Sequence, residues 1–269
     1  MTYSAAITRI LPNSFGNCVT NVDNTQSPID IKLAQSQHDR YVDVLKKYIP
    51  NVIVVETDEA HPDCSFVEDN ATVFEHTAVI NQPGHPSRRG EVGAIEKALK
   101  QIPSVKSIIR MEEVDKDALV DGGDVLNTGA HVFVGLSERT NEKGGRVLQK
   151  AFDGLAQTFI LQPPGEMLHL KCCVTALEDT KTLIAVDSAR AVVDEMNRLT
   201  DNYYTAIYVP DLVAANVLSA NGVVLIQEGF PRSEQILRDH LTSAQVVALN
   251  MSEIIKADGA LTCGSILIK

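Results

Sequence analysis

A strand-and-helix pattern recurs about every 50 residues along the chain, and few architectures accommodate such a repeat. Each copy has a short apolar strand, two further strands that read as a hairpin, and an amphipathic helix. The residue that opens the first hairpin strand recurs at steps of 53, 48, 47 and 47 residues. We call these five positions the register residues: Glu68, Asp121, His169, Asn216 and Cys263.

Four copies follow one another in the order strand, hairpin, helix. The first covers a strand at 51–56, a hairpin at 65–74 and 77–80, and a helix at 90–102; the others run through 105–155, 158–199 and 204–241. A strand at 5–11 and a C-terminal strand complete the first and last units, and a further helix is predicted over 29–48.

Such units can close radially, as in a propeller, with their strand ends near the axis. Closure would bring an acid, a histidine and a cysteine from distant units into one central pocket, within a single domain over residues 1–269. The alternative is a doubly wound α/β sheet, in which these residues lie on different strand ends and never meet.

Charge and composition limit the class of protein. The formal net charge of −11 makes the average surface repel nucleic acid and attract a small cation. The sequence has no run of about 18 apolar residues, so no membrane-spanning helix is expected. The opening residues lack the basic region and apolar stretch of a secretion signal. Five cysteines, an odd and sparse set, favour free thiols in a reducing compartment. We expect a soluble cytoplasmic protein without nucleic-acid or membrane partners.

Cysteine, histidine and an acid from separate segments are typical of a nucleophilic triad, here Cys263, His169 and Asp121. A thiolate attacks, an imidazole moves protons, and a carboxylate orients the imidazole. The alternatives are a small buried cysteine, a core histidine on an apolar stretch and an aspartate in a glycine turn.

Two adjacent carboxylates, Glu68 and Asp69, lie within an apolar run, where burial without a cation is costly. On a strand they would point to opposite sides. With Asp63 and Asp121 they predict a ring of acids around a planar guanidinium. The alternative is a strand edge that faces water.

Two arginines, Arg88 and Arg139, each follow a hairpin, where a guanidinium can hold a substrate carboxylate. Solvated surface arginines are the alternative. The His169-x-x-Cys172-Cys173 run has no second cysteine pair, so we expect no structural zinc site. No glycine motif for nucleotide phosphates is present.

Seven stretches together resemble the dimethylarginine dimethylaminohydrolase family of guanidine-modifying enzymes. They span nearly the whole chain in that family's order: Arg9-Ile-Leu-Pro12, Asp63-Cys-Ser-Phe-Val-Glu-Asp69, Pro83-Gly-His-Pro-Ser-Arg-Arg89, Asp121-Gly-Gly-Asp-Val-Leu126, Gly135-Leu-Ser-Glu-Arg-Thr-Asn141, Leu168-His-Leu-Lys171 and Asp258-Gly-Ala-Leu-Thr-Cys263. The resemblance implies a five-bladed α/β propeller with Cys263 as nucleophile, His169 as general acid and base, and Asp121 as the residue that orients His169.

The resemblance also implies the substrate contacts. Asp63, Glu68 and Asp69 match positions around the substrate guanidinium and its neighbours. Arg88 and Arg139 match the clamp on the substrate carboxylate, Asp258 matches the position near the α-amine, and residues 13–28 correspond to a lid. The lid stretch Gly16-Asn-Cys-Val-Thr20 lacks a clear counterpart of the family's leucine, and Gly264 stands where some members have a second cysteine.

The implied reaction converts N-omega-methylated arginine to citrulline and a methylamine through a thiouronium on Cys263, without metal or organic cofactor. The protein would be a monomer or homodimer. One alternative is another guanidine hydrolase or an amidinotransferase, with arginine deiminase chemistry as an example. A second is a non-catalytic propeller that binds cationic ligands or metal through the same acids.

Overall fold

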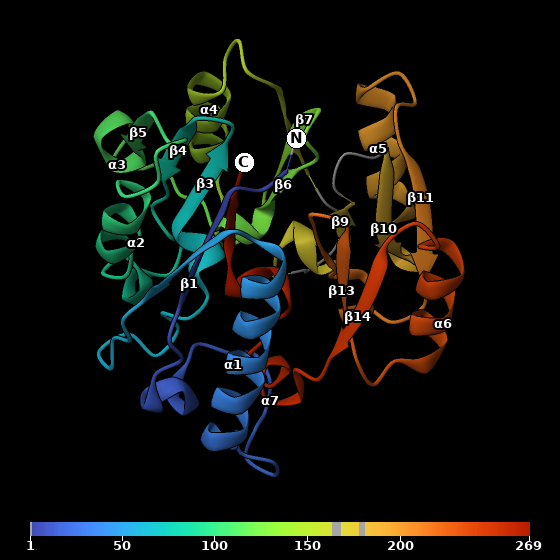
Figure 1. The fold of residues 1–269 in the computed structure, drawn as a ribbon. Coiled ribbons are helices and arrows are strands. Elements are labelled where there is room, and N and C mark those ends of the chain that lie inside the picture. Colours follow the sequence, from blue (N-terminus) through green and yellow to red (C-terminus); the bar gives the residue numbers. More distant parts are fainter. Residues whose placement is uncertain (1, 163–167, 178–180) are drawn as a thin grey trace.

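Fifteen strands in the described residues form five three-stranded sheets arranged around a centre, with helices on the outside (Figure 1). The structure is a computed structural model that describes residues 2–162, 168–177 and 181–269. In spatial order the sheets are β15 (Ile266–Ile268), β1 (Ala5–Arg9) and β2 (Asn51–Val55); β3 (Ala71–Phe74), β4 (Thr77–Ile80) and β5 (Ser107–Arg110); β6 (Val125–Asn127), β7 (His131–Gly135) and β8 (Gln157–Leu161); β9 (Val174–Ala176), β10 (Thr182–Val186) and β11 (Thr205–Val209); and β12 (Leu218–Ala220), β13 (Val223–Gln227) and β14 (Gln245–Leu249). The fold is the five-bladed α/β propeller.

Each sheet has the same internal pairing. In the second sheet, β4 pairs antiparallel with β3 and parallel with β5, and the chain crosses from β4 to β5 through a helix. The strand that we placed at the start of each copy therefore completes the sheet of the preceding hairpin. The last strand, β15, pairs antiparallel with β1, and this pairing joins the two ends of the chain and closes the ring.

The helices fit the expected positions within a few residues and lie at the periphery (Figure 1). Two of them, α1 and α4, begin at a capping side chain that accepts an otherwise unpaired backbone N–H: Asp30 accepts from Leu33, and Asn141 accepts from Gly144. Two single-turn helices, α3 and α7, were not predicted. The bounds are α1 (Ile31–Tyr48), α2 (Val92–Leu99), α3 (Met111–Val114), α4 (Glu142–Ala151), α5 (Arg190–Leu199), α6 (Pro231–His240) and α7 (Ser252–Ile255).

A one-turn 3-10 helix stands before the first strand of each blade, and each register residue lies in or beside one of these turns. The five turns are η2 (Val67–Asn70), η4 (Gly122–Asp124), η5 (Leu170–Cys172), η7 (Val213–Ala215) and η8 (Thr262–Gly264). Contacts join η2 to η8, η2 to η4, and η4 to η5. The prediction that register residues open strands was therefore wrong by a few residues: they occupy turns, which aim side chains toward neighbouring blades.

The apolar core lies between the sheets and the helices and continues across neighbouring blades. One cluster of buried residues holds Phe133 of β7, Ile184 of β10 and Ile226 of β13. In the fourth blade, for example, Ile184 and Met196 are fully buried between β10 and α5. Within the described residues, no helix is both long and apolar enough to cross a membrane.

Candidate active site

Eight of the nine predicted site residues line one pocket, which we call the axial pocket. It is lined by residues from the turns η2, η4, η5 and η8 or beside them, together with parts of several loops. The eight are Asp63, Asp69, Arg88, Asp121, Arg139, His169, Asp258 and Cys263. Glu68 is not among the lining residues.

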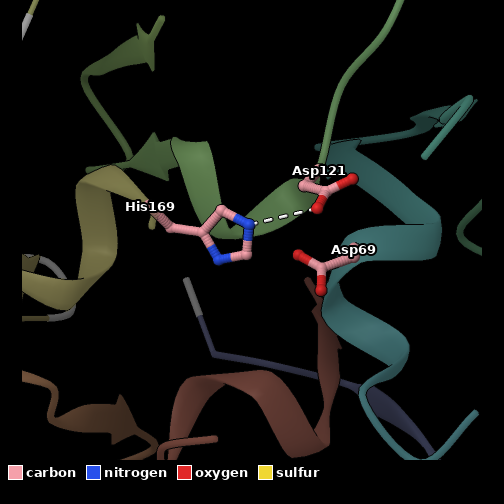
Figure 2. Close-up of side chains that lie close together, drawn as sticks. All are labelled: Asp69, Asp121 and His169. Carbon is pink, nitrogen blue, oxygen red and sulfur yellow. Dashed lines mark hydrogen bonds and ion pairs between the residues drawn. The ribbon is translucent and has the colours of Figure 1, made fainter. Parts of the chain in front are cut away.

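Asp121 and His169 come from neighbouring blades and point at each other (Figure 2). The Nε2 atom of His169 lies 3.1 Å from Oδ2 of Asp121, and both side chains are buried. The other oxygen of Asp121 accepts a 2.8 Å hydrogen bond from the N–H of Gly84. Asp121 is therefore held on one side by backbone and can orient the imidazole on the other.

The glycine pair that follows Asp121 packs closely on two neighbours, Gly122 on the backbone of Glu68 and Gly123 on the imidazole of His169. A Cβ atom on Gly123 would lie 2.4 Å from Nδ1 of His169, and one on Gly122 would lie 1.9 Å from the carbonyl oxygen of Glu68. Both positions need glycine because of this close approach. The Asp-Gly-Gly stretch is thus a packing surface for the imidazole as well as a turn.

Three carboxylates determine the charge of His169. Burial lowers its pKa, but the charge of Asp69, the hydrogen bond to Asp121 and the charge of Asp124 outweigh burial and raise the pKa to about 9. Asp69 lies beside the pair in Figure 2, and one ligand atom from each of Asp69, Asp121 and His169 falls within 4.8 Å of the others. His169 is therefore an imidazolium at neutral pH and a competent proton donor.

These three residues also form a candidate metal cluster, but their potential ligand atoms already take part in hydrogen bonds within the protein. Asp69 accepts hydrogen bonds from Gly123 (2.8 Å) and Arg88 (2.6 Å), and Asp121 accepts from Gly84 and His169. A protonated imidazole is not a metal ligand. The donor set fits a proton-transfer site better than a metal centre.

Cys263 lies in the turn η8 and is partly exposed to the axial pocket. Burial of the thiol, followed by the charges of Glu68 and Asp69, raises its pKa well above the usual value. The thiol is therefore protonated in the free protein. A cation bound in the pocket would offset both carboxylates and favour the thiolate.

Arg88 is buried, and protein groups engage its guanidinium. It donates to Asp69, to Glu91 at 2.9 and 3.1 Å, and to the carbonyl of Phe66 at 2.8 Å. Burial alone would raise the pKa of Asp69, but the charges of His169 and Arg88 hold it below its usual value. The structure therefore gives Arg88 a role that the sequence did not suggest, which is to keep Asp69 ionised; its contact with a substrate carboxylate stays a prediction.

Arg139 differs from Arg88 in its surroundings. It follows β7, is partly exposed and lines the axial pocket. Within residues 2–162, 168–177 and 181–269, no hydrogen-bond or ion-pair partner is recorded for its guanidinium. Its donors are therefore available to an anionic group in the pocket.

Glu68 faces a second cavity, which we call the rear cavity. The two described lining sets share no residue, and the rear cavity includes Glu68, Lys171 and Thr262. Lys171 donates to one oxygen of Glu68 (2.6 Å) and Thr262 to the other (2.8 Å). The structure thus differs from the expectation that Glu68 holds a guanidinium: its partners are already present, and its neighbour Asp69 faces the axial pocket.

The lid residues 13–28 contact two side chains that are predicted to bind substrate, Asp63 and Asp258. Asp63 accepts from the N–H of Val19 at 3.1 Å, and burial raises the pKa of Asp63 to about 6 although Arg88 opposes the shift. Asp258 accepts from the hydroxyl of Thr20 (3.0 Å) and the N–H of Asn21 (2.7 Å). The lid begins with the 3-10 helix η1 (Asn13–Asn17), and Val19 lines the axial pocket in the part of the lid where the sequence lacks the expected leucine.

Sequence reasoning missed several residues that support the site, namely Gly84, Glu91, Asp124, Lys171, Asn216 and Thr262. Five of them stood in stretches already singled out: Asn216 among the register residues, and the others in family-like motifs, namely Gly84, Asp124, Lys171 and Thr262. Their partners are remote in sequence, as for Asp124, which accepts from the N–H of Leu170. Spacing alone does not reveal such partners.

Comparisons with known proteins show the family of the chain. The sequence model of a family described as "N,N dimethylarginine dimethylhydrolase, eukaryotic" matches residues 12–265. N(G),N(G)-dimethylarginine dimethylaminohydrolase of Streptomyces coelicolor is 29% identical over 98% of this chain and 96% of its own length. The protein of the same name from Pseudomonas aeruginosa is 30% identical over 88% and 89%. A solved structure from Pseudomonas aeruginosa, a cysteine-to-serine mutant complexed with citrulline, has a TM-score of 0.85 at 26% identity and covers 99% of this chain and 100% of that chain.

Proposed function

The chain belongs to the dimethylarginine dimethylaminohydrolase family and is a hydrolase, and we propose that it converts N-omega-methylated arginine to citrulline and a methylamine. One observation carries the proposal: the hydrogen-bonded pair of His169 and Asp121 lies in the same acidic pocket as the Cys263 thiol. A thiol with a raised pKa among carboxylates suits a substrate that brings its own positive charge.

The first half of the reaction transfers the amidine carbon to sulfur. The substrate guanidinium enters between the carboxylates, and Cys263 loses its proton to solvent. The thiolate adds to the guanidinium carbon, and the tetrahedral centre collapses as His169 gives its proton to the departing dimethylamine. The carbon–nitrogen bond breaks, and a cationic thiouronium stays on Cys263.

The second half uses His169 as a base. The neutral imidazole, held by Asp121, takes a proton from a water molecule that adds to the thiouronium carbon. The carbon–sulfur bond then breaks, citrulline leaves, and Cys263 and His169 return to their starting protonation states. Substrate cation and water become citrulline and a dimethylammonium ion, so atoms and charge balance without cofactor or metal.

Recognition divides the substrate into a cationic end and an amino-acid end. Asp69 is ionised at neutral pH and would hold the guanidinium, with Asp63 beside it. Arg139 would pair with the α-carboxylate and Asp258 with the α-amine. Because Asp63 and Asp258 now hold lid backbone, the lid would have to release them as substrate enters.

We also propose a single domain over residues 1–269, because the pocket draws residues from the N-terminal lid to the C-terminal turn η8. The small cationic substrate would be the main partner of a monomer or homodimer. A cytoplasmic location is consistent with the five cysteines, all free in the structure.

Product analysis tests the proposed function. The purified protein, incubated with asymmetric dimethylarginine, is expected to release citrulline and dimethylamine in equal amounts and to leave arginine largely unchanged. Ammonia from arginine as the faster reaction would indicate a deiminase. Transfer of the amidino group to an added amine would indicate an amidinotransferase, and no product from either substrate would favour the binding protein.

The pH dependence tests the charge states of the site. The reactive complex has a thiolate and an imidazolium, one proton fewer than the free enzyme at neutral pH, where both groups are protonated. kcat/KM is therefore expected to rise about tenfold per pH unit and to level off near pH 9, where His169 releases its proton. A profile that is flat from about pH 6.5 to 9 would mean that the resting thiol is already ionised, contrary to this account.

A further inference from the structure

Asn216 is the register residue of the fifth blade, and the mechanism above assigns it no role. We propose that Asn216 is a positioning residue for the hydrolysis: its side-chain amide holds the turn that carries Cys263 against the segment that carries His169. This inference rests on the proposed function and adds a residue to it.

The amide of Asn216 makes three hydrogen bonds. Nδ2 donates to the carbonyl of Lys171 (3.1 Å) and to the hydroxyl of Thr262 (3.1 Å), while Oδ1 accepts from the N–H of Thr262 (3.0 Å). Lys171 lies two residues after His169, and Thr262 immediately precedes Cys263. One side chain of the fifth blade therefore joins the fourth blade to the turn that carries the nucleophile.

The hydrogen-bond network continues to the turn η2, which carries Glu68. Because the Thr262 hydroxyl accepts from Asn216, its own proton is directed to Glu68 at 2.8 Å. Glu68 in turn accepts from the Lys171 side chain at 2.6 Å. Asn216 thereby holds both the backbone N–H and the hydroxyl of Thr262. The hydrogen bond from that hydroxyl to Glu68 holds η8 against η2.

Because Asn216 and Thr262 are buried, water cannot easily take over the hydrogen bonds of the Asn216 amide. Asn216 is 3% exposed and Thr262 is 6% exposed. Removing the amide would leave the Thr262 N–H and the Lys171 carbonyl without these partners, and the turn η8 would shift to recover them. A displacement of about 1 Å at a reacting atom can cost about a hundredfold in rate.

The expected signature separates positioning from substrate binding. The proposed contacts with the amino-acid end of the substrate come from Arg139 and Asp258, which lie outside this network. Asn216→Ala is therefore expected to lower kcat about ten- to a hundredfold while KM stays within about threefold. Alkylation of Cys263 by iodoacetamide is expected to become at least about threefold faster, because the released turn exposes the thiol.

Asn197 supplies a matched control. It uses its amide in the same way, accepting from the N–H of Tyr204 (2.8 Å) and donating to its carbonyl (3.0 Å), at the end of α5 away from the pocket. Asn197→Ala is expected to lower thermal stability with kcat and Cys263 alkylation unchanged. An equal loss of kcat in both variants would mean that Asn216 acts only on overall stability and would overturn the inference.

Thr262 provides a second route if Asn216→Ala folds poorly. Thr262→Val removes the hydroxyl that links Asn216 to Glu68 and is expected to lower kcat, whereas Thr262→Ser keeps the hydroxyl and recovers most of that loss. In a double-mutant cycle, adding Thr262→Val to Asn216→Ala should cost less than Thr262→Val alone, because both act on one turn. Fully additive effects would contradict the proposal.

The alkylation readout does not depend on the substrate. If the wild-type protein fails to turn over methylated arginine, the proposed function is wrong, but the rate of Cys263 alkylation still reports on the turn. An Asn216→Ala variant that is alkylated at the wild-type rate, or one with kcat within twofold of wild type, would overturn the role of Asn216.

Discussion

Replacing Cys263 with serine is expected to reduce citrulline formation from asymmetric dimethylarginine by about four orders of magnitude or more. The site raises the pKa of the thiol through burial and the charges of Glu68 and Asp69, so the resting nucleophile is already difficult to ionise. A serine hydroxyl is far less acidic than a thiol and would meet the same carboxylates. The substrate cation can generate a thiolate in this pocket but not an alkoxide.

The variant should still bind ligand, because the carboxylates and Arg139 are unchanged. Citrulline formation is measured with Cys172→Ser as the control, since Cys172 is another partly exposed cysteine but does not line the axial pocket. We expect Cys172→Ser to retain normal turnover. Turnover within tenfold of wild type in Cys263→Ser would rule out Cys263 as the nucleophile.

Replacing His169 with alanine is expected to lower kcat with dimethylarginine by about a thousandfold. Dimethylamine leaves poorly unless it is protonated, and the variant has no imidazolium to supply the proton. An arginine analogue with a methylthio group in place of the amine does not need that proton to leave. The variant should therefore still react with this analogue and accumulate a stable adduct on Cys263, because the base for hydrolysis is also missing.

Mass spectrometry of the His169→Ala protein after incubation with the methylthio analogue checks this prediction. His240→Ala is the control, because His240 lies on the exposed end of α6. The control should turn over dimethylarginine normally and show no lasting adduct. Rapid loss of the adduct from the His169→Ala protein would show that another group activates the water.

The propeller was predictable from the sequence because the blade is a local unit. Apolar periodicity located the five longer helices and most strands, and the spacing of the register residues predicted about five copies. The strand pairing was less accessible, because β5 completes the sheet of β4 only through a parallel crossover. Periodicity describes each strand but carries no information on which neighbour it pairs with.

Some features of the candidate site were likewise predictable from the sequence, and others were not. His169 and Asp121 were proposed together because the reaction requires a base and an orienting acid, and the structure brings them into hydrogen-bond contact. The partner of Glu68 was missed, because Lys171 lies 103 residues away and an ion pair leaves no pattern in one sequence. The adjacent acids were also read as a strand, whereas they lie in the turn η2, which sends them to different cavities.

The most direct measurement captures the covalent intermediate. Wild-type protein mixed with asymmetric dimethylarginine is quenched in acid during steady turnover, and its peptides are analysed by mass spectrometry. The account predicts one adduct, with the mass of the substrate less dimethylamine, on the peptide that contains Cys263. Steady citrulline formation with an unmodified Cys263, or with the adduct on another cysteine such as Cys18, would contradict it.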